Sequence, residues 1–444
     1  MIAEAPKRIP LIGHALPLLA DPLQFLTALP ETGDLVRVRV GPVQVVVVCD
    51  PELTRQVLVD DRTFDKGGPS FDSGLDDFGD GLASVPHSRH RRRRRLAQPS
   101  FHRSRYENYA RMMSGHIDTA TKGWRAGDVL DVRTEMTSLS MAIAVDTMFS
   151  SALPAARLRQ AVDDLQTFVS GIHRTMVLPG PVARLPLPAN VRYRAAVDRL
   201  RRTVREIVAE RRATGGDHND LLSSLLLARD GDDAADQGLT DSEVVDEVLT
   251  FFAAGSETIA GTISWALYLL ASNPEEYQRL REEVDRVVAD DAATFEDVPK
   301  LEFTNRVVTE ALRLYPPAWI VTRSVTADTQ LGAHTLPAGT FVAWSPYILH
   351  RQDSLFENAA RFVPDRWDDA LHEQPHRTSF ITFGGGARKC IGDHFSYVEA
   401  TLALATITKR WTLELVDGER VKPAPSTTLY PKNLRMRVVS GGPA

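Results

Sequence analysis

The sequence predicts a mainly α-helical fold with small β-sheets, of the α+β class, in a single domain over residues 1–444. Three observations support this prediction. Apolar residues recur with helical spacing over most of residues 103–315 and again over 393–410. Strand-like runs lie near both ends of the chain, around residues 35–49, 319–345 and 412–439. No repeat, linker or break in composition divides the chain, although its length alone would suggest about three domains.

The composition excludes several classes of protein. The 444 residues are 43% hydrophobic and 25% charged, with a net charge of −6, which is typical of globular proteins and argues against disorder. Two cysteines, Cys49 and Cys390, are too few for a disulfide scaffold or a zinc ribbon. We therefore expect a cytoplasmic protein.

The first fifty residues predict no targeting segment and one β-hairpin. Pro10 and Pro17 interrupt the N-terminal residues, which lack the apolar core of a secretory signal or an anchor. Residues 35–40 and 43–48 flank Gly41-Pro42 and read as the two arms of the hairpin. Cys49 follows, and we expect it to be a small buried hydrophobic residue.

The longest predicted helix begins after a capping box, Thr240-Asp241-Ser242-Glu243, and stops at Asn273-Pro274. Roughly 30 residues at about 1.5 Å each would cross a whole domain, so the middle of this helix must be buried. Residues 248–272 are also long enough to cross a bilayer. Because Glu257 would lie at the bilayer centre, at a cost of at least about 2.5 kcal/mol, we favour a buried helix of a protein without a membrane anchor.

The middle turn of this helix, residues 254–258, is weak and polar. Gly255 costs the helix about 1 kcal/mol relative to alanine, and Thr258 can bond back to the Ala254 carbonyl. This pattern indicates that something small and polar binds there. The alternative is that both residues are tolerated for packing.

The segment Phe383–Gly392 carries the most chemistry. Its glycines do not form a phosphate-binding loop, because Lys389 stands where a third glycine is needed and no Walker lysine follows. Cys390 ends the glycine-rich turn just before the predicted helix 393–410. The helix N-terminus, Arg388 and Lys389 should favour the thiolate form. The thiolate could act as a nucleophile, with His394 one turn away, or as a ligand of haem iron.

This segment resembles the haem-thiolate loop of the cytochrome P450 family. The family pattern Phe-x-x-Gly-x-Arg-x-Cys-x-Gly is matched at Phe383, Gly386, Arg388, Cys390 and Gly392. Three further segments resemble family motifs in the family's order: residues 254–258, 310–313 and 362–367. The resemblance implies the cytochrome P450 fold, with the long central helix over the haem and the cysteine loop beneath it.

The resemblance also implies a cofactor site for haem b. Cys390 would be the iron ligand, Phe383 would shield it, and Gly386 and Gly392 would let the backbone approach the porphyrin. Cations would bind the propionates. The residues expected to contact the haem are His90, Arg94, Ala254, Arg323, Phe383, Gly386, Arg388, Cys390 and Gly392.

Two charged groups of residues receive roles from the same resemblance. Glu310, Arg313 and Arg366 would form a triad that fixes the cysteine loop, whereas an exposed Glu310–Arg313 pair would contribute little. The arginine run at residues 89–95 would dock an acidic electron-transfer partner. A nucleic-acid role is disfavoured by the net charge of −6, and a solvated helix face is the alternative.

The implied activity is that of a monooxygenase. Thr258 and Glu257 would be the catalytic residues, holding dioxygen and delivering protons. The family often has an aspartate and two threonines here, where this chain has Glu257-Thr258-Ile259. Electrons would have to come from another protein, because no dinucleotide fingerprint is present. The resemblance to soluble bacterial-type members implies a ferredoxin and an NAD(P)H-dependent ferredoxin reductase as the partners. We expect a monomer.

The substrate is expected to be neutral and apolar, such as a terpenoid or another secondary metabolite, and to be hydroxylated. This expectation rests on the apolar segment 168–188, where Arg174 and Arg184 are the candidate cations, and on the predicted pocket. The pocket residues are Phe251, Ala254, Trp319, Ile320, Val321 and Leu429. Two alternatives are a haem-thiolate peroxygenase or isomerase that needs no external electrons, and a haem-binding sensor module.

Overall fold

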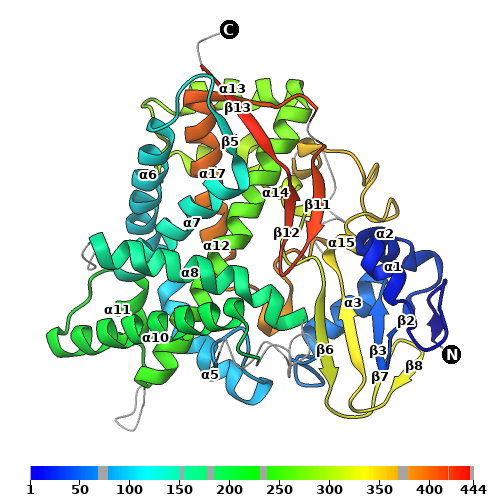
Figure 1. Ribbon diagram of the computed structural model, residues 1–444. Coiled ribbons are helices and arrows are strands. Elements are labelled where there is room, and N and C mark those ends of the chain that lie inside the picture. Colours follow the sequence, from blue (N-terminus) through cyan, green and yellow to red (C-terminus); the bar gives the residue numbers. More distant parts are fainter. Residues whose placement is uncertain are drawn as a thin grey trace.

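The structure is a computed structural model that describes residues 2–68, 79–150, 155–177, 185–230, 238–368, 379–418 and 420–440, without the side chains of 155–158, 172–177 and 440. Helices gather on one side of the molecule and the largest sheet lies on the other (Figure 1). The predicted fold class, mainly α with small sheets, is confirmed.

The described α-helices are α1 (Ala15–Ala20), α2 (Pro22–Thr27), α3 (Pro51–Val59), α5 (His87–Ala97), α6 (Tyr106–Lys122), α7 (Val132–Phe149), α8 (Ala155–Val177), α10 (Pro188–Thr214), α11 (Leu221–Leu227), α12 (Asp241–Ser272), α13 (Pro274–Val287), α14 (Glu302–Leu314), α15 (Pro346–Leu349) and α17 (Asp393–Arg410). The described strands are β1 (Ala3–Glu4), β2 (Leu35–Val40), β3 (Val43–Val48), β4 (Phe64–Asp65), β5 (Val129–Asp131), β6 (Val321–Val325), β7 (Thr329–Leu331), β8 (His334–Leu336), β9 (Phe341–Trp344), β10 (Trp411–Leu415), β11 (Lys422–Pro425), β12 (Leu429–Lys432) and β13 (Arg435–Ser440).

The largest sheet has the strand order β1-β2-β3-β9-β6-β4. Strands β2 and β3 are antiparallel, with Leu35 paired to Val48, as the hairpin pattern predicts. Gly41, at a φ of 55°, makes the turn between them. Cys49 follows β3 and is 2% exposed, which confirms that it is a buried residue. Burial raises the pKa of its thiol to about 12.

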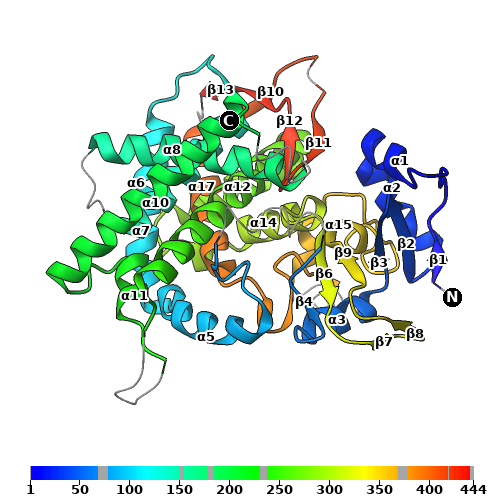
Figure 2. The same ribbon diagram turned by 60° about the horizontal axis from the view of Figure 1, so that its bottom comes forward.

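Helix α12 runs through the centre of the helical side and packs against α7, α14 and α17 (Figures 1 and 2). Both halves of the predicted capping box are present, with Thr240 accepting from the Glu243 amide and Glu243 accepting from the Thr240 amide. The helix ends at Asn273, as predicted. Within the described residues, no helix is both long and apolar enough to cross a bilayer.

Three elements differ from the sequence pattern. Strand β5 interrupts the predicted helical region and pairs with β13 near the C-terminal end of the chain. Helix α1 contains Pro17, which its first turn accommodates because the amides there need no helical partner. The hairpin β11–β12 lies inside the predicted β-rich part 412–439, but its two strands were not predicted individually, because prolines occupy both and proline normally argues against a paired strand.

Candidate functional site

The cysteine loop is a tight turn whose shape depends on glycine. The Cys390 amide donates to the Phe383 carbonyl over 2.8 Å and closes the loop. Gly386 has a φ of 62°, and a Cβ atom built there would lie 2.3 Å from the Leu58 carbonyl oxygen at the end of α3. Only glycine tolerates both conditions, so Gly386 fixes the loop against α3.

Cys390 is exposed at the end of this loop, yet its surroundings do not favour the thiolate in the protein alone. Dense protein around the sulfur raises the pKa of the thiol, and the Gly392 amide, Arg94 and Lys389 offset this only in part. Lys389 and the helix N-terminus thus favour the thiolate as predicted, but burial outweighs them and the net pKa shift is upward. Arg388 does not contribute because it turns away to Asp65, at 2.6 Å. A coordinated metal ion would lower the pKa of this thiol, since metal binding deprotonates a thiol.

The four predicted haem cations lie around this loop. Arg94 donates to the Lys389 carbonyl, and His90 lies one turn earlier on α5. Arg388 donates to the Val85 carbonyl over 2.9 Å. Arg323, on β6, is 5% exposed, and burial together with the charge of Arg388 lowers its pKa to about 10. Burial and the same arginine lower the pKa of His90 to about 4.

These residues fit a haem group. Like charges are buried close together, and although Asp61 and Asp65 pair with Arg388, a further anionic group among the cations would be favourable. The buried Nδ1 atom of His90 has no hydrogen-bond partner among the described residues. Gly392 is not required by the protein itself, because a Cβ atom there would make only an ordinary 3.6 Å contact with Phe101. A thiol, buried cations and open space beside a glycine are what a haem with two propionates needs.

The middle turn of α12 is open on one side. Ala254 is exposed although the helix around it is buried, and a Cβ atom at Gly255 would meet nothing within 4 Å. Thr258 is half-buried, and its hydroxyl donates to the Ala254 carbonyl over 2.6 Å, as the sequence suggests. The lone pairs of that hydroxyl are then free to accept a hydrogen bond.

Glu257 faces two residues that the sequence did not indicate. Its carboxylate lies 3.9 Å from the Arg133 guanidinium of α7 and 3.5 Å from the Thr427 hydroxyl in the β11–β12 turn. Burial raises the pKa of Glu257, while Arg133 and the threonines Thr427 and Thr428 oppose this rise. The side chain is 15% exposed and that of Arg133 is 43% exposed. Together they connect the middle of α12 to solvent.

Glu310, Arg313 and Arg366 meet in a buried cluster. Arg313 donates twice to Glu310, each time over 2.8 Å, and both side chains are fully buried. Arg366 lies 3.5 Å from the same carboxylate. Arg313 also donates to the carbonyls of His350 and Ala359. This is a network that ties α14 to the chain leading into the cysteine loop, not an exposed ion pair.

The predicted pocket residues divide into two groups. Phe251, Trp319, Ile320 and Val321 are half-buried, with some surface open. Leu429 is fully buried against Leu23 and Tyr347, so its placement on a pocket wall was wrong. The alternation of strand β12 turns Leu429 inward and leaves the turn before it, residues 426–428, beside α12. Arg184 and the side chain of Arg174 lie outside the described residues.

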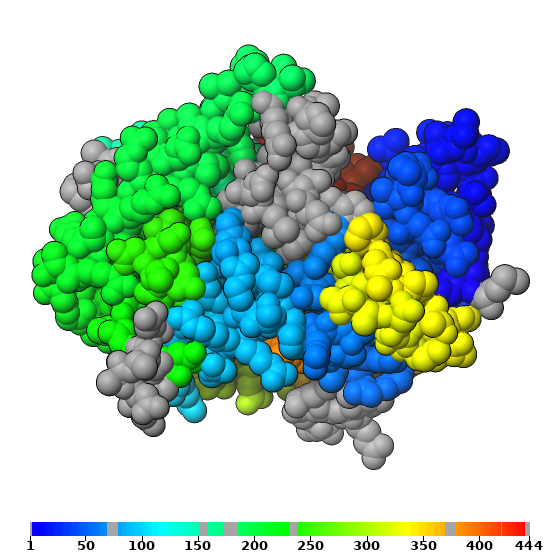
Figure 3. All heavy atoms as spheres, turned by 90° about the horizontal axis from the view of Figure 1, so that it is seen from below, coloured from blue at the N-terminus to red at the C-terminus, as the bar shows by residue number. Residues whose placement is uncertain are grey.

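Most arginines of the run on α5 form ion pairs with acidic residues of this chain. Arg89 pairs with Asp80, Arg92 and Arg93 with Glu243, and Arg95 with Asp230. Arg91 is exposed and has no ion pair within the described residues. Seen from below, α5 lies at the surface between the green residues of α10 and α11 and the yellow residues of β7 and β8 (Figure 3).

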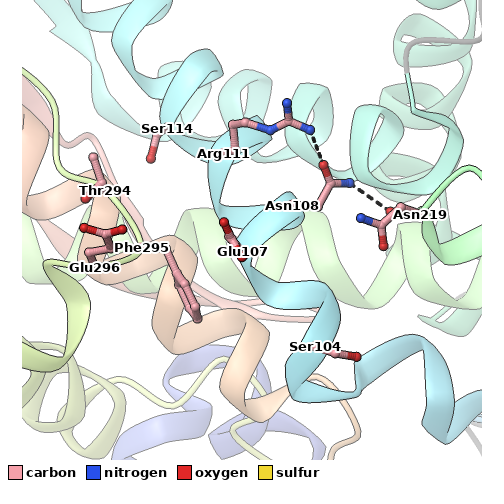
Figure 4. A pocket seen from close by; sticks show the side chains of 9 residues that line it. All are labelled: Ser104, Glu107, Asn108, Arg111, Ser114, Asn219, Thr294, Phe295 and Glu296. Atoms are coloured by element: carbon pink, nitrogen blue, oxygen red, sulfur yellow. Dashed lines mark hydrogen bonds between the residues drawn. The ribbon is translucent and has the colours of Figure 1, made fainter.

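A separate groove of about 640 Å³ lies between α6 and residues 294–296 (Figure 4). Its polar side chains pair with one another, because Arg111 bonds to Asn108 and Asn108 bonds to the Asn219 carbonyl. None of the predicted site residues lines it. The groove is open and lined mostly by polar residues, unlike an enclosed site for an apolar substrate.

The chain is similar to known proteins over nearly its whole length. Pentalenene oxygenase of Streptomyces avermitilis is 42% identical over 99% of this chain and 97% of its own. Two proteins of Streptomyces melanosporofaciens, cyclooctat-9-en-7-ol 5-monooxygenase and cyclooctatin synthase, are 42% and 41% identical over 96% and 97% of this chain and 90% and 94% of their own. The family model described as Cytochrome P450 matches residues 4–437. The chain therefore belongs to the cytochrome P450 family.

Proposed function

We propose that this monooxygenase inserts one oxygen atom from dioxygen into a terpenoid. The observation that carries the proposal is the open turn of α12, where an apolar surface at Ala254 adjoins the Thr258 hydroxyl. The three similar Streptomyces proteins include an oxygenase named for pentalenene and one named for cyclooctat-9-en-7-ol. A hydrocarbon or lightly hydroxylated ring system matches the half-buried Phe251, Trp319 and Ile320.

The haem, bound through the Cys390 thiolate, supplies the activation of dioxygen. The chain's own residues bind the substrate and move protons. Thr258 is oriented by its bond to the Ala254 carbonyl, so its oxygen accepts a hydrogen bond from water or from a protonated group. Glu257 has a raised pKa and therefore carries a proton more readily than an ordinary carboxyl near neutral pH. Arg133 connects it to solvent.

The proposed electron donors are a ferredoxin and its NAD(P)H-dependent reductase, which act on a monomer in the cytoplasm. An acidic ferredoxin would meet the face that carries α5. The cations that remain there for a partner are Arg91 and Arg103, which are exposed and have no ion pair within the described residues. Arg89 and Arg95 are held by acids of this chain, so they are weaker candidates.

The test is turnover of a panel of cyclic terpenes and terpene alcohols by the purified holoenzyme with a ferredoxin, a reductase and NADPH. The expected result is a hydroxylated product that carries one atom of ¹⁸O from ¹⁸O₂. Fatty acids and charged macrolides serve as matched negative substrates. Product from those substrates and none from terpenes would contradict the proposed substrate class. Product formed with hydrogen peroxide but not with the reductase system would contradict the proposed use of external electrons.

A further inference from the structure

Helix α14 ends in a way that leaves two of its carbonyl groups without helical partners. Pro316 and Pro317 follow the helix, and proline has no amide hydrogen. They therefore cannot donate to the carbonyls of Leu312 and Arg313, as the residues of a longer helix would. Both residues are buried, so these two carbonyls need partners from elsewhere in the protein.

Both carbonyls hold the chain that leads into the cysteine loop. The Thr382 hydroxyl donates directly to the Leu312 carbonyl over 3.1 Å. The Arg313 carbonyl lies 3.1 Å from Nδ1 of His350, and Nε2 of the same ring lies 3.1 Å from the Ile381 amide. One connection between α14 and the loop is thus direct, and the other passes through an imidazole ring.

The protonation of this ring follows from its surroundings. His350 is fully buried, and burial, followed by the charge of Arg313, lowers its pKa to about 3, although the carbonyls of Arg313 and Ser379 oppose this in part. The ring is therefore neutral and carries one proton. Because a carbonyl can only accept, that proton lies on Nδ1, toward Arg313. The Nε2 lone pair is then left to accept from the Ile381 amide.

The imidazole is held in one orientation. The Arg313 guanidinium donates to the His350 carbonyl over 2.7 Å, so the two residues bond to each other in both directions. The ring stacks on Phe380, with centroids 5.3 Å apart and planes at 15°, and meets Phe356 nearly edge-on at 5.6 Å. A ring fixed in this way also fixes the Ile381 amide that it accepts from.

Ile381 begins the cysteine loop. The Gly384 amide donates to the Ile381 carbonyl over 2.8 Å, and Gly384 has a φ of 70°, a conformation that favours glycine. The Phe383 carbonyl, between these two residues, accepts from the Cys390 amide. A shift of Ile381 would therefore disturb both the turn and the hydrogen bond that closes the loop.

We propose that His350 is a positioning residue for the haem ligand, and that its imidazole holds Ile381, and through it the loop of Cys390, against the end of α14. The sequence pattern did not indicate this role, because His350 lies far from Cys390 in the chain and follows the short helix α15. The inference rests on haem binding through Cys390 and not on the substrate class.

The experiment measures how long the reduced holoenzyme with carbon monoxide keeps its red-shifted Soret band, at a urea concentration where the far-UV circular dichroism of every variant is still native. His350→Phe keeps an aromatic ring but bonds to neither partner. It should lose the band roughly tenfold faster than the wild type, because a buried amide and a buried carbonyl lose their partner.

His14→Phe is the matched control. His14 is also fully buried, and its ring also joins a carbonyl to an amide, those of Ala5 and Arg39, beside β1 and β2. This variant should lower the urea midpoint of unfolding, as His350→Phe does. It should nevertheless keep the band about as long as the wild type, because His14 does not contact the cysteine loop.

Two further variants separate the two bonds of the ring. An asparagine amide reaches the position of Nδ1, whereas a glutamine amide reaches that of Nε2. His350→Gln should therefore still accept from the Ile381 amide and keep the band nearly as long as the wild type. His350→Asn should retain only the bond to the Arg313 carbonyl and lose the band nearly as fast as His350→Phe. Hydrogen exchange in the peptide 379–392 should be fast in the phenylalanine and asparagine variants and slow in the other two proteins.

Three results would overturn the proposal. The first is an equal band lifetime in the wild type and His350→Phe. The second is a loss in His14→Phe as fast as that in His350→Phe, because the band would then report global stability. The third is rescue by His350→Asn and not by His350→Gln, because the bond to Ile381 would then not position the loop. A wild type that never shows the band would contradict the assignment of Cys390 itself, which distinguishes that failure from a failure of the role of His350.

Discussion

The Arg133 guanidinium lies 3.9 Å from the Glu257 carboxylate and stacks on the Tyr430 ring, 3.4 Å from its centroid. The arginine is thereby fixed by the β11–β12 hairpin while it faces the middle of α12. Trp265 and Trp319 hold the same hairpin through indole hydrogen bonds to the carbonyls of Leu429 and Ser426. The acid beside Thr258 is thus held by a hairpin that the sequence pattern did not reveal.

Replacing Arg133 should change the pH dependence of the reaction. Arg133 lowers the pKa of Glu257, so Arg133→Met should raise that pKa further and move the Glu257-dependent limb of the profile to higher pH. The measurement is product formation against pH. Arg133→Lys should retain most of the wild-type profile, and Arg202→Met, which removes an exposed cation of α10, should leave it unchanged. A profile that does not move in Arg133→Met would show that the pair has no part in proton delivery.

Thr258→Ala should uncouple electron consumption from product formation. The substitution removes the hydroxyl that accepts hydrogen bonds in the open turn and frees the Ala254 carbonyl. Helix stability should change little, because a threonine that bonds back to its own helix is at best neutral. We expect the product formed per NADPH to fall severalfold while hydrogen peroxide accumulates. Thr258→Ser should restore coupling, and unchanged coupling in Thr258→Ala would contradict the role of Thr258.

Removing Arg313 should destabilise the protein strongly. Arg313→Met leaves the Glu310 carboxylate buried with only part of its network, a change that typically costs about 3–5 kcal/mol. The expected results are a large drop in the urea midpoint of unfolding and loss of haem during purification. Arg279→Met is the control, because its ion pairs with Glu276 and Asp365 are partly exposed. A midpoint within experimental error of the wild type would show that the network contributes little.

Glu399 should make stability fall as the pH rises. This side chain of α17 is 1% exposed and accepts a hydrogen bond from Ser140 over 2.7 Å, and burial raises its pKa to about 8. The folded state therefore keeps a proton that the unfolded state loses above its ordinary pKa of 4.5. The Glu399 contribution is fully present below pH 4.5 and is lost as the pH rises to about 8.

The measurement is the urea midpoint of wild type and Glu399→Gln between pH 5 and pH 9. The glutamine cannot ionise. As the pH rises within this window, the free energy of unfolding of the variant should therefore increase relative to that of the wild type by up to about 1.4 kcal/mol per pH unit. Glu282→Gln, at an exposed position on α13, should follow the wild type at every pH. Parallel curves for wild type and Glu399→Gln would mean that Glu399 stays charged when folded.

The features that the sequence predicted well are set by neighbours in the chain. The capping box at Thr240 and the hairpin around Gly41 follow local backbone rules, and the structure contains both. The bond from Thr258 to the Ala254 carbonyl is a helical contact of the same kind. Such features need no knowledge of the rest of the fold.

The features that the sequence missed depend on contacts between distant segments. Thr427 reaches Glu257 only because a proline-containing hairpin folds back on α12. Leu429 was assigned to the pocket, whereas it is fully buried against Leu23 and Tyr347. The net rise in the pKa of the Cys390 thiol was not predicted, because local cations can be counted from sequence, whereas burial cannot.

The central claim is that Cys390 binds the haem iron as a thiolate. The most direct measurement is the absorption spectrum of the reduced holoenzyme with carbon monoxide. We predict a strongly red-shifted Soret band, which disappears in Cys390→His although haem is still bound. A wild-type Soret band at the position typical of histidine-ligated haem proteins would contradict the account.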